Sequence, residues 1–154
     1  QGDLRFVDVL QSMGAVVGRD AGSTTVRGTD NLHGITVDLR DLSDMVPTLA
    51  AVAVFADSPT TITGVGFIRG KESDRIGDLI TELRRCGVDA VEHDDGLTIT
   101  PGAVRPARIR TYDDHRVAMA FALIGLRVPG IEIEDPACVA KTFPGYFDAL
   151  DQLR

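Results

Sequence analysis

Apolar residues recur at helical spacing over residues 73–86, near the middle of the chain. The i, i+3, i+4, i+7 pattern is met by Ile76, Leu79, Ile80 and Leu83. This predicts an amphipathic helix over Ser73–Cys86, ended by Gly87. Two other segments, Met45–Ala56 and Val117–Leu126, are apolar on nearly all sides. Helices of that kind are buried, so these two segments are expected to form the core.

Strands are predicted where residues alternate in polarity or are rich in β-branched side chains. Gly34–Leu39 alternates, and Thr60–Val65 is β-branched. Asp94-Asp95-Gly96 is a hairpin turn signal, so the strands on either side of it should pair antiparallel. The other predicted strands are Ala90–His93, Leu97–Thr100, Ala15–Gly18, Thr24–Arg27, Ala107–Thr111 and Gly130–Ile133. The other predicted helices are Leu4–Met13, Asp44–Ala56, Asp114–Leu126 and Thr142–Leu153, the last with Thr142 as its N-cap.

The pattern repeats at an offset of 70 residues, the separation of Lys71 from Lys141. At this offset Ile76 aligns with Tyr146, and one step back from Ile76 reaches Phe6. One unit consists of a strand, a helix, a strand, a helix and two strands. Residues 1–29 are then the end of a first unit, 34–101 a second unit, and 107–154 a third, incomplete unit. The expected fold is α/β, with buried helices side by side, sheets outside, and helix N-termini that together favour an anion.

Charge and composition narrow the possible partners. The net charge of −7 argues against nucleic acid, although a local cationic cluster can still bind a small anionic substrate. The longest apolar stretch, residues 45–56, falls short of the about 20 residues that span a bilayer. Cys86 and Cys138 fit neither a metal site nor a disulfide framework and are expected to be buried thiols in a reducing compartment. The three histidines, His33, His93 and His115, show no metal-ligand spacing. A start in mid-pattern at Gln1, with no signal peptide, indicates a piece of a longer protein.

Charged residues gather before the helix predicted at residues 73–86. The segment Arg69–Arg75 holds three cations and two carboxylates. It can be a solvated run that pairs with itself, or an anion site in which a carboxylate carries a proton. The chain has 14 arginines but only two lysines, Lys71 and Lys141, at matching repeat positions. Chance and a bias toward arginine can explain this, or these positions can need a compact, titratable donor.

A second polar segment, Tyr112–Arg116, precedes the last buried helix. Asp113 or Asp114 can cap that helix. His115 and Arg116 would lie in its first turn, where a cation is unfavourable unless an anion is bound there. Asp44, at the matching position of the previous unit, can be an N-cap or a general base.

Three strings in this order resemble the C-terminal half of the 5-enolpyruvylshikimate-3-phosphate synthases. They are GKESDRIGDLITELRRCG, TYDDHRVAMAF and DPACVAKTFPGYFDAL, and the likeness spans essentially the whole chain. The resemblance implies that this chain is most of the C-terminal domain of a two-domain enolpyruvyl transferase. Each of the two domains would be an inside-out α/β barrel. It implies a cytoplasmic monomer whose cleft lies between the domains and which uses no metal or organic cofactor. The substrates would be phosphoenolpyruvate and shikimate 3-phosphate, with the N-terminal domain of the same polypeptide completing the site.

The same resemblance suggests roles for individual residues. Asp44 would accept the proton of the 5-hydroxyl of shikimate 3-phosphate, and Lys71 would contact that substrate. Glu72 would exchange a proton with the methylene carbon of phosphoenolpyruvate. The cations for its carboxylate and phosphate would be Arg75, Arg116 and Lys141, with His115 in support and Lys141 also counted among the catalytic residues. Phe67 stands where some family members have a polar substrate contact, so it receives no role.

Two other functions remain open from the sequence. The related UDP-N-acetylglucosamine enolpyruvyl transferases share the fold and the donor substrate, but are not expected to combine the Lys-Glu-x-Asp-Arg and Ala-Lys-Thr-Phe-Pro strings. A non-catalytic anion-binding module would have no reason to place Asp44 and Glu72 among its cations. The chain alone is expected to be inactive, because closure onto the other domain completes the site.

Overall fold

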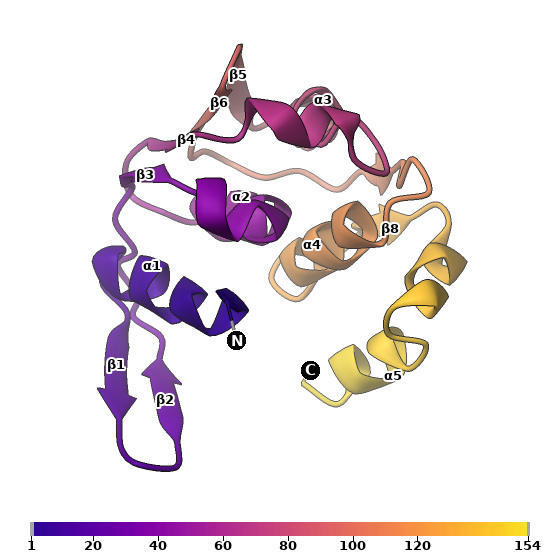
Figure 1. Ribbon diagram of the computed structural model, residues 1–154. Helices are drawn as coiled ribbons and strands as arrows, with labels where there is room; N and C mark the ends of the chain where they lie inside the picture. Colours follow the sequence, from indigo (N-terminus) through magenta and orange to yellow (C-terminus); the bar gives the residue numbers. More distant parts are fainter. Residues whose placement is uncertain (1, 154) are drawn as a thin grey trace.

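The computed structural model describes residues 2–153, and Figure 1 shows their course. The α-helices are α1 (Phe6–Ser12), α2 (Val46–Ala53), α3 (Gly77–Arg85), α4 (His115–Gly125) and α5 (Tyr146–Asp151). The 3-10 helices are η1 (Gly2–Arg5), η2 (Arg40–Met45), η3 (Gly66–Gly70) and η4 (Pro136–Lys141). The strands are β1 (Val16–Arg19), β2 (Thr24–Arg27), β3 (Thr36–Asp38), β4 (Thr60–Thr63), β5 (Asp89–His93), β6 (Gly96–Thr100), β7 (Arg108–Ile109) and β8 (Glu132–Ile133).

The largest sheet has the strand order β3-β4-β6-β5. β3 and β4 are parallel and joined through α2, whereas β5 and β6 form the hairpin expected around Asp94-Asp95-Gly96. Gly96 is needed where β6 approaches β4, because a Cβ there would lie 1.9 Å from the carbonyl oxygen of Ile62. Smaller two-stranded sheets pair β1 with β2 antiparallel and β7 with β8 in parallel. The mixed sheets and helices make an α/β fold.

The core is built around α2 and α4, which pack against each other as the apolar patterns predict (Figure 1). Val46, Leu49 and Val117 are fully buried there. The two helices run in the same direction. Arg116 at the start of α4 reaches Asp44 just before α2, while Arg127 after α4 lies 4.9 Å over the ring of Phe55 after α2. Both N-termini therefore open at the same end of the molecule.

The order of elements recurs along the chain. A parallel strand pair enclosing a helix occurs as β3-α2-β4 and again as β7-α4-β8. Each is followed by a 3-10 helix and an α-helix, η3 and α3 or η4 and α5. Lys71 directly follows η3, and Lys141 is the last residue of η4. The aligned residues Phe6, Ile76 and Tyr146 are all buried at the starts of α1, α3 and α5.

Several helix starts differ from the predicted ones. α3 begins at Gly77 rather than Ser73, because the Asp74 carboxylate accepts the backbone N–H groups of Ile76 and Gly77 at 3.1 and 3.0 Å and holds a turn. The predicted N-cap Thr142 is wrong, because the chain there leaves η4 and α5 starts at Tyr146. α2 starts at Val46, after η2. Periodicity does not reveal such 3-10 segments, which are set by short i to i+3 contacts.

The cysteines and the lengths of the apolar helices can also be compared with the sequence. Cys86 and Cys138 are free and buried, as expected. Within residues 2–153, no helix has the length and apolar character needed to cross a bilayer.

Candidate functional site

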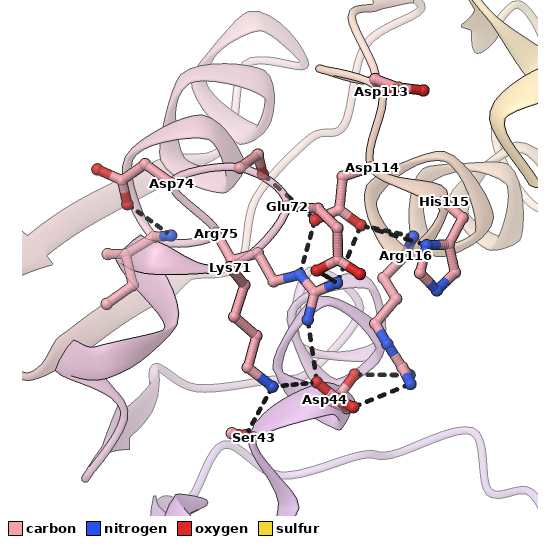
Figure 2. A network of polar contacts seen from close by, with 12 residues as sticks. Ser43, Asp44, Lys71, Glu72, Asp74, Arg75, Asp113, Asp114, His115 and Arg116 are labelled. Atoms are coloured by element: carbon pink, nitrogen blue, oxygen red, sulfur yellow. Dashed lines mark hydrogen bonds and ion pairs between the residues drawn. The ribbon is translucent and has the colours of Figure 1, made fainter.

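Three segments far apart in the sequence meet beside the N-termini of α2 and α4 (Figure 2). Ser43 and Asp44 come from η2, and residues 71–75 from the loop before α3. Residues 113–114 belong to the turn before α4, and His115 and Arg116 are the first residues of that helix. Asp44 and Glu72 are 38% and 40% exposed, and Lys71 and Arg116 are each 28% exposed. The cluster is therefore open to a solvent-borne ligand.

Asp44 is the centre of this cluster. One carboxylate oxygen accepts Lys71 Nζ at 2.5 Å and Arg75 Nη1 at 2.9 Å, and the other accepts Arg116 Nη2 at 3.0 Å. Burial by itself raises the pKa of Asp44, but the Lys71 hydrogen bond and the three positive charges outweigh it, so the pKa lies below its ordinary value. The alternative that Asp44 caps α2 is wrong, because the N-cap position is Met45 and no side chain caps the helix.

Arg75 is the buried member, with 1% of its side chain exposed. Its Nε and Nη2 donate to the two oxygens of Asp114, at 2.7 and 3.2 Å, and Nη2 also donates to Glu72 at 2.7 Å. Asp114 is fully buried. Burial raises its pKa, but the hydrogen bonds from Arg75 and from the backbone of Arg116 outweigh this, so the carboxyl has a lowered pKa and stays ionised.

Asp114 also caps α4, which decides between the two capping candidates. Its carboxylate accepts the backbone N–H of Arg116 at 2.8 Å. This places a negative charge at the helix N-terminus, where the helix dipole favours it. His115 and Arg116 follow directly in the first turn of the helix. His115 Nδ1 is buried, with no hydrogen-bond partner among the described residues. Burial is the main reason that the pKa of His115 is lowered, so the imidazole is neutral at pH 7.

The turn before α4 has an unusual backbone. Tyr112 and Asp113 both have φ of 56°, and Asp114 N donates to Thr111 O at 2.9 Å across the turn. The left-handed region is uncommon for non-glycine residues and costs about 1–3 kcal/mol at each. The carbonyl of Asp113 accepts Lys141 Nζ at 3.3 Å. Strain of this kind, next to charged groups, is characteristic of functional sites.

The structure thus brings most of the candidate residues into one network. Its members are Asp44, Lys71, Glu72, Arg75 and Arg116. Lys141 lies one step away, bound to the turn rather than to Asp44.

Phe67 is on η3 and 56% exposed. Among residues 2–153, no three His, Cys, Asp or Glu side chains are grouped as in a metal site.

Three members of the site were missed or only half recognised from the sequence. Asp114 was expected only as a cap, and its bond to Arg75 joins residues 39 apart in sequence. Ser73 Oγ donates to the same carboxylate at 3.3 Å, and Ser43 Oγ accepts from Lys71 Nζ at 3.4 Å. The only signal for either serine was its position next to a charged candidate.

Comparison with known proteins gives consistent relatives. The family model described as EPSP synthase (3-phosphoshikimate 1-carboxyvinyltransferase) matches residues 1–150. The 3-phosphoshikimate 1-carboxyvinyltransferase of Nostoc punctiforme is 53% identical over 153 residues, which cover 99% of this chain and 36% of that protein. The chloroplastic 3-phosphoshikimate 1-carboxyvinyltransferase of Brassica napus is 44% identical, over 99% of this chain and 31% of that protein.

A solved structure agrees. EPSP synthase from Acinetobacter baumannii superposes with a TM-score of 0.85 at 28% identity, over 98% of this chain and 39% of that one. The chain spans about a third of the length of the curated relatives it matches. With a family match over nearly its whole length and an α/β fold shared with a solved member, the chain belongs to the EPSP synthase (3-phosphoshikimate 1-carboxyvinyltransferase) family.

Proposed function

We propose that this chain is the phosphoenolpyruvate-handling part of an enzyme that transfers the enolpyruvyl group of phosphoenolpyruvate to the 5-hydroxyl of shikimate 3-phosphate. The 5-hydroxyl oxygen would bond to C2 of phosphoenolpyruvate, its proton passing to Asp44, while C3 gains a proton from Glu72. The C2–O bond to phosphate would then break, C3 would return its proton to Glu72, and phosphate would leave. Two acid–base carboxylates among cations are the groups that this sequence of steps needs.

The cations would take the charges of the two substrates. Lys71 would contact shikimate 3-phosphate, and Arg75, Arg116 and Lys141 would hold the carboxylate and phosphate of phosphoenolpyruvate. His115, neutral and beside Asp114, would support Arg116 rather than carry a proton. Arginine suits this task because its planar donors match carboxylate and phosphate oxygens.

The observation that carries the proposal is that three cations converge on Asp44. Lys71, Arg75 and Arg116 all donate to its carboxylate, which keeps its pKa below the ordinary value and makes it a weak base. An anionic substrate would compete for these same donors. Its binding would free Asp44, allow the pKa of that carboxyl to rise, and so produce a base only when substrate is present.

The wider architecture is part of the same proposal. Residues 1–29, 34–101 and 107–154 would be parts of three units of an inside-out α/β barrel with buried parallel helices. This barrel would be most of the C-terminal domain of a cytoplasmic two-domain enzyme, whose N-terminal domain supplies the rest of the site. The chain spans about a third of its curated relatives, which fits a part of that size. Alone, it should bind phosphoenolpyruvate weakly and turn over no substrate.

The test is phosphate release by the complete gene product supplied with phosphoenolpyruvate and shikimate 3-phosphate. Asp44→Asn and Glu72→Gln should each lower kcat by about 100-fold or more, since general acid–base groups contribute about 10²–10⁴-fold. Asp41→Asn is the matched control, because Asp41 is an exposed carboxylate in the same 3-10 helix. Wild-type turnover by both site variants would refute the roles, and consumption of UDP-N-acetylglucosamine in place of shikimate 3-phosphate would refute the acceptor.

A further inference from the structure

Glu82 is a fully buried carboxylate that the proposed chemistry does not use. It lies in α3, whose other buried residues are the apolar Leu79, Ile80 and Leu83. A charged group at such a position is unfavourable unless it is paired and hydrogen-bonded. The groups that hydrogen-bond to Glu82 therefore indicate which segment its carboxylate holds in place.

Two of these partners belong to the segment that leads into α4. Glu82 Oε1 accepts the hydroxyl of Tyr112 at 2.8 Å, and Oε2 accepts the backbone N–H of Arg110 at 3.2 Å. The third partner is Arg85 in the same helix, whose Nε is 3.2 Å from Oε2. The carboxylate thus ties α3 to a segment 28–30 residues further along the chain.

That segment contains the strained turn. A bulky residue such as Tyr112 keeps a φ of 56° only where surrounding contacts impose it. Here the ring is covered by the guanidinium of Arg110, 4.9 Å from its centroid, and the hydroxyl is held by Glu82. Burial, followed by the bond to Glu82, raises the pKa of Tyr112, so the phenol remains a donor at neutral pH.

The Tyr112–Asp113 turn positions two parts of the candidate site. The carbonyl of Asp113 accepts Lys141, and the next carboxylate, Asp114, pairs with Arg75 and caps α4. Figure 2 shows Asp114 directed into the network while the Asp113 side chain points away from it. A rotation of the turn would move Lys141 and Arg75 together.

We propose that Glu82 is a positioning residue that acts through Tyr112, holding the Tyr112–Asp113 turn so that Lys141 and the Asp114–Arg75 pair face one bound phosphoenolpyruvate. This inference rests on the proposed function. It also differs from a purely structural role in a measurable way. Loss of folded enzyme lowers kcat alone, whereas a displaced turn raises KM for phosphoenolpyruvate and leaves KM for shikimate 3-phosphate in place.

The experiment uses the complete gene product with Glu82→Met, which is similar in length but has no oxygen to accept from Tyr112, Arg110 or Arg85. KM for phosphoenolpyruvate should rise about 10- to 100-fold, the scale of a small displacement of a positioned group, with KM for shikimate 3-phosphate within about twofold of wild type. Ile80→Val is the control, because it weakens the same helix at a buried position whose apolar side chain cannot hydrogen-bond to the turn. It should leave both KM values unchanged.

A second measurement does not depend on turnover. The urea midpoints of Glu82→Met, Tyr112→Phe and the double variant form a cycle. The double variant should unfold no earlier than Glu82→Met alone, since both changes remove the same bond. Unchanged KM values in Glu82→Met, or strictly additive midpoint losses, would overturn the inference. An inactive wild-type enzyme would instead refute the proposed function, and the urea cycle would then decide the anchoring role by itself.

Discussion

Replacing Asp114 by Asn tests whether the buried ion pair with Arg75 organises the site. Asn retains the size of the residue and remains a good N-cap, so the helix start at His115 is kept. The change removes the charge that faces Arg75, whose side chain is only 1% exposed. The variant therefore isolates the ion pair from the cap.

The expected loss follows from burial. Removing one partner of a buried pair costs about 3–5 kcal/mol, because the remaining charge is left uncompensated. Arg75 keeps Asp44 and Glu72, both partly exposed, so we expect the lower end, about 3 kcal/mol of unfolding free energy. For a chain of this size that corresponds to a fall in Tm of roughly 6–12 °C.

The loss should depend on pH in a defined direction. The pKa of Asp114 is lowered in the folded state, so its contribution to stability is fully present above the unfolded value, near 3.8. It is lost as the pH falls through the lower, folded pKa. The difference between wild type and Asp114→Asn should therefore be largest near pH 7 and shrink below about pH 4.

The assay is urea unfolding of the chain at pH 7 and at acidic pH, followed by circular dichroism. Asp113→Asn is the matched control, since Asp113 is exposed and Asn tolerates its left-handed backbone. That control should change stability by less than about 0.5 kcal/mol. If Asp114→Asn were as mild as Asp113→Asn, or its effect were independent of pH, the buried pair would not be stabilising and the reasoning would be refuted.

Two further predictions concern parts of the fold outside the site. Gly96→Ala should lower the free energy of unfolding in urea by about 1–3 kcal/mol, because its Cβ would collide with the Ile62 carbonyl of the neighbouring strand. Gly102→Ala is the control, since a Cβ there meets open space and should leave stability unchanged. Equal losses in the two variants would contradict the packing argument. Burial raises the pKa of the Cys86 thiol to about 11. Cys86 should therefore not react with a thiol reagent at pH 8 until urea unfolds the chain. Rapid labelling of this residue in the native protein would contradict its burial.

The sequence by itself determined the local elements and their repetition. The helical spacing of α3, the all-apolar character of α2 and α4 and the turn signal at residues 94–96 each arise from neighbours a few positions apart. Such short-range patterns are visible in one sequence because they reflect which side of an element meets the core. The parallel course of α2 and α4, and the meeting of their N-termini, were expected from the recurrence of the buried helix at an offset of 70 residues.

Only the tertiary structure decided how the charged residues are shared. The run Arg69–Arg75 offered both a self-paired and an anion-binding interpretation, and the structure divides it. Arg69 pairs with Asp74 and Glu92, while Arg75 is buried against Asp114. Asp44 proved to be the centre of the network and not a cap.

The same holds for Lys141, which binds the turn, and for Glu82, which gave no signal in the helical pattern except a charge among apolar neighbours. The bonds from Lys141 to Asp113, from Arg110 to Glu82 and from Arg116 to Asp44 join residues 28 to 72 positions apart. The energy of an ion pair depends on distance, burial and the competing partners, and all three are fixed only when separate segments pack together. A pattern within one segment can therefore predict which elements form, whereas the choice of partner for each charge is decided by the folded structure.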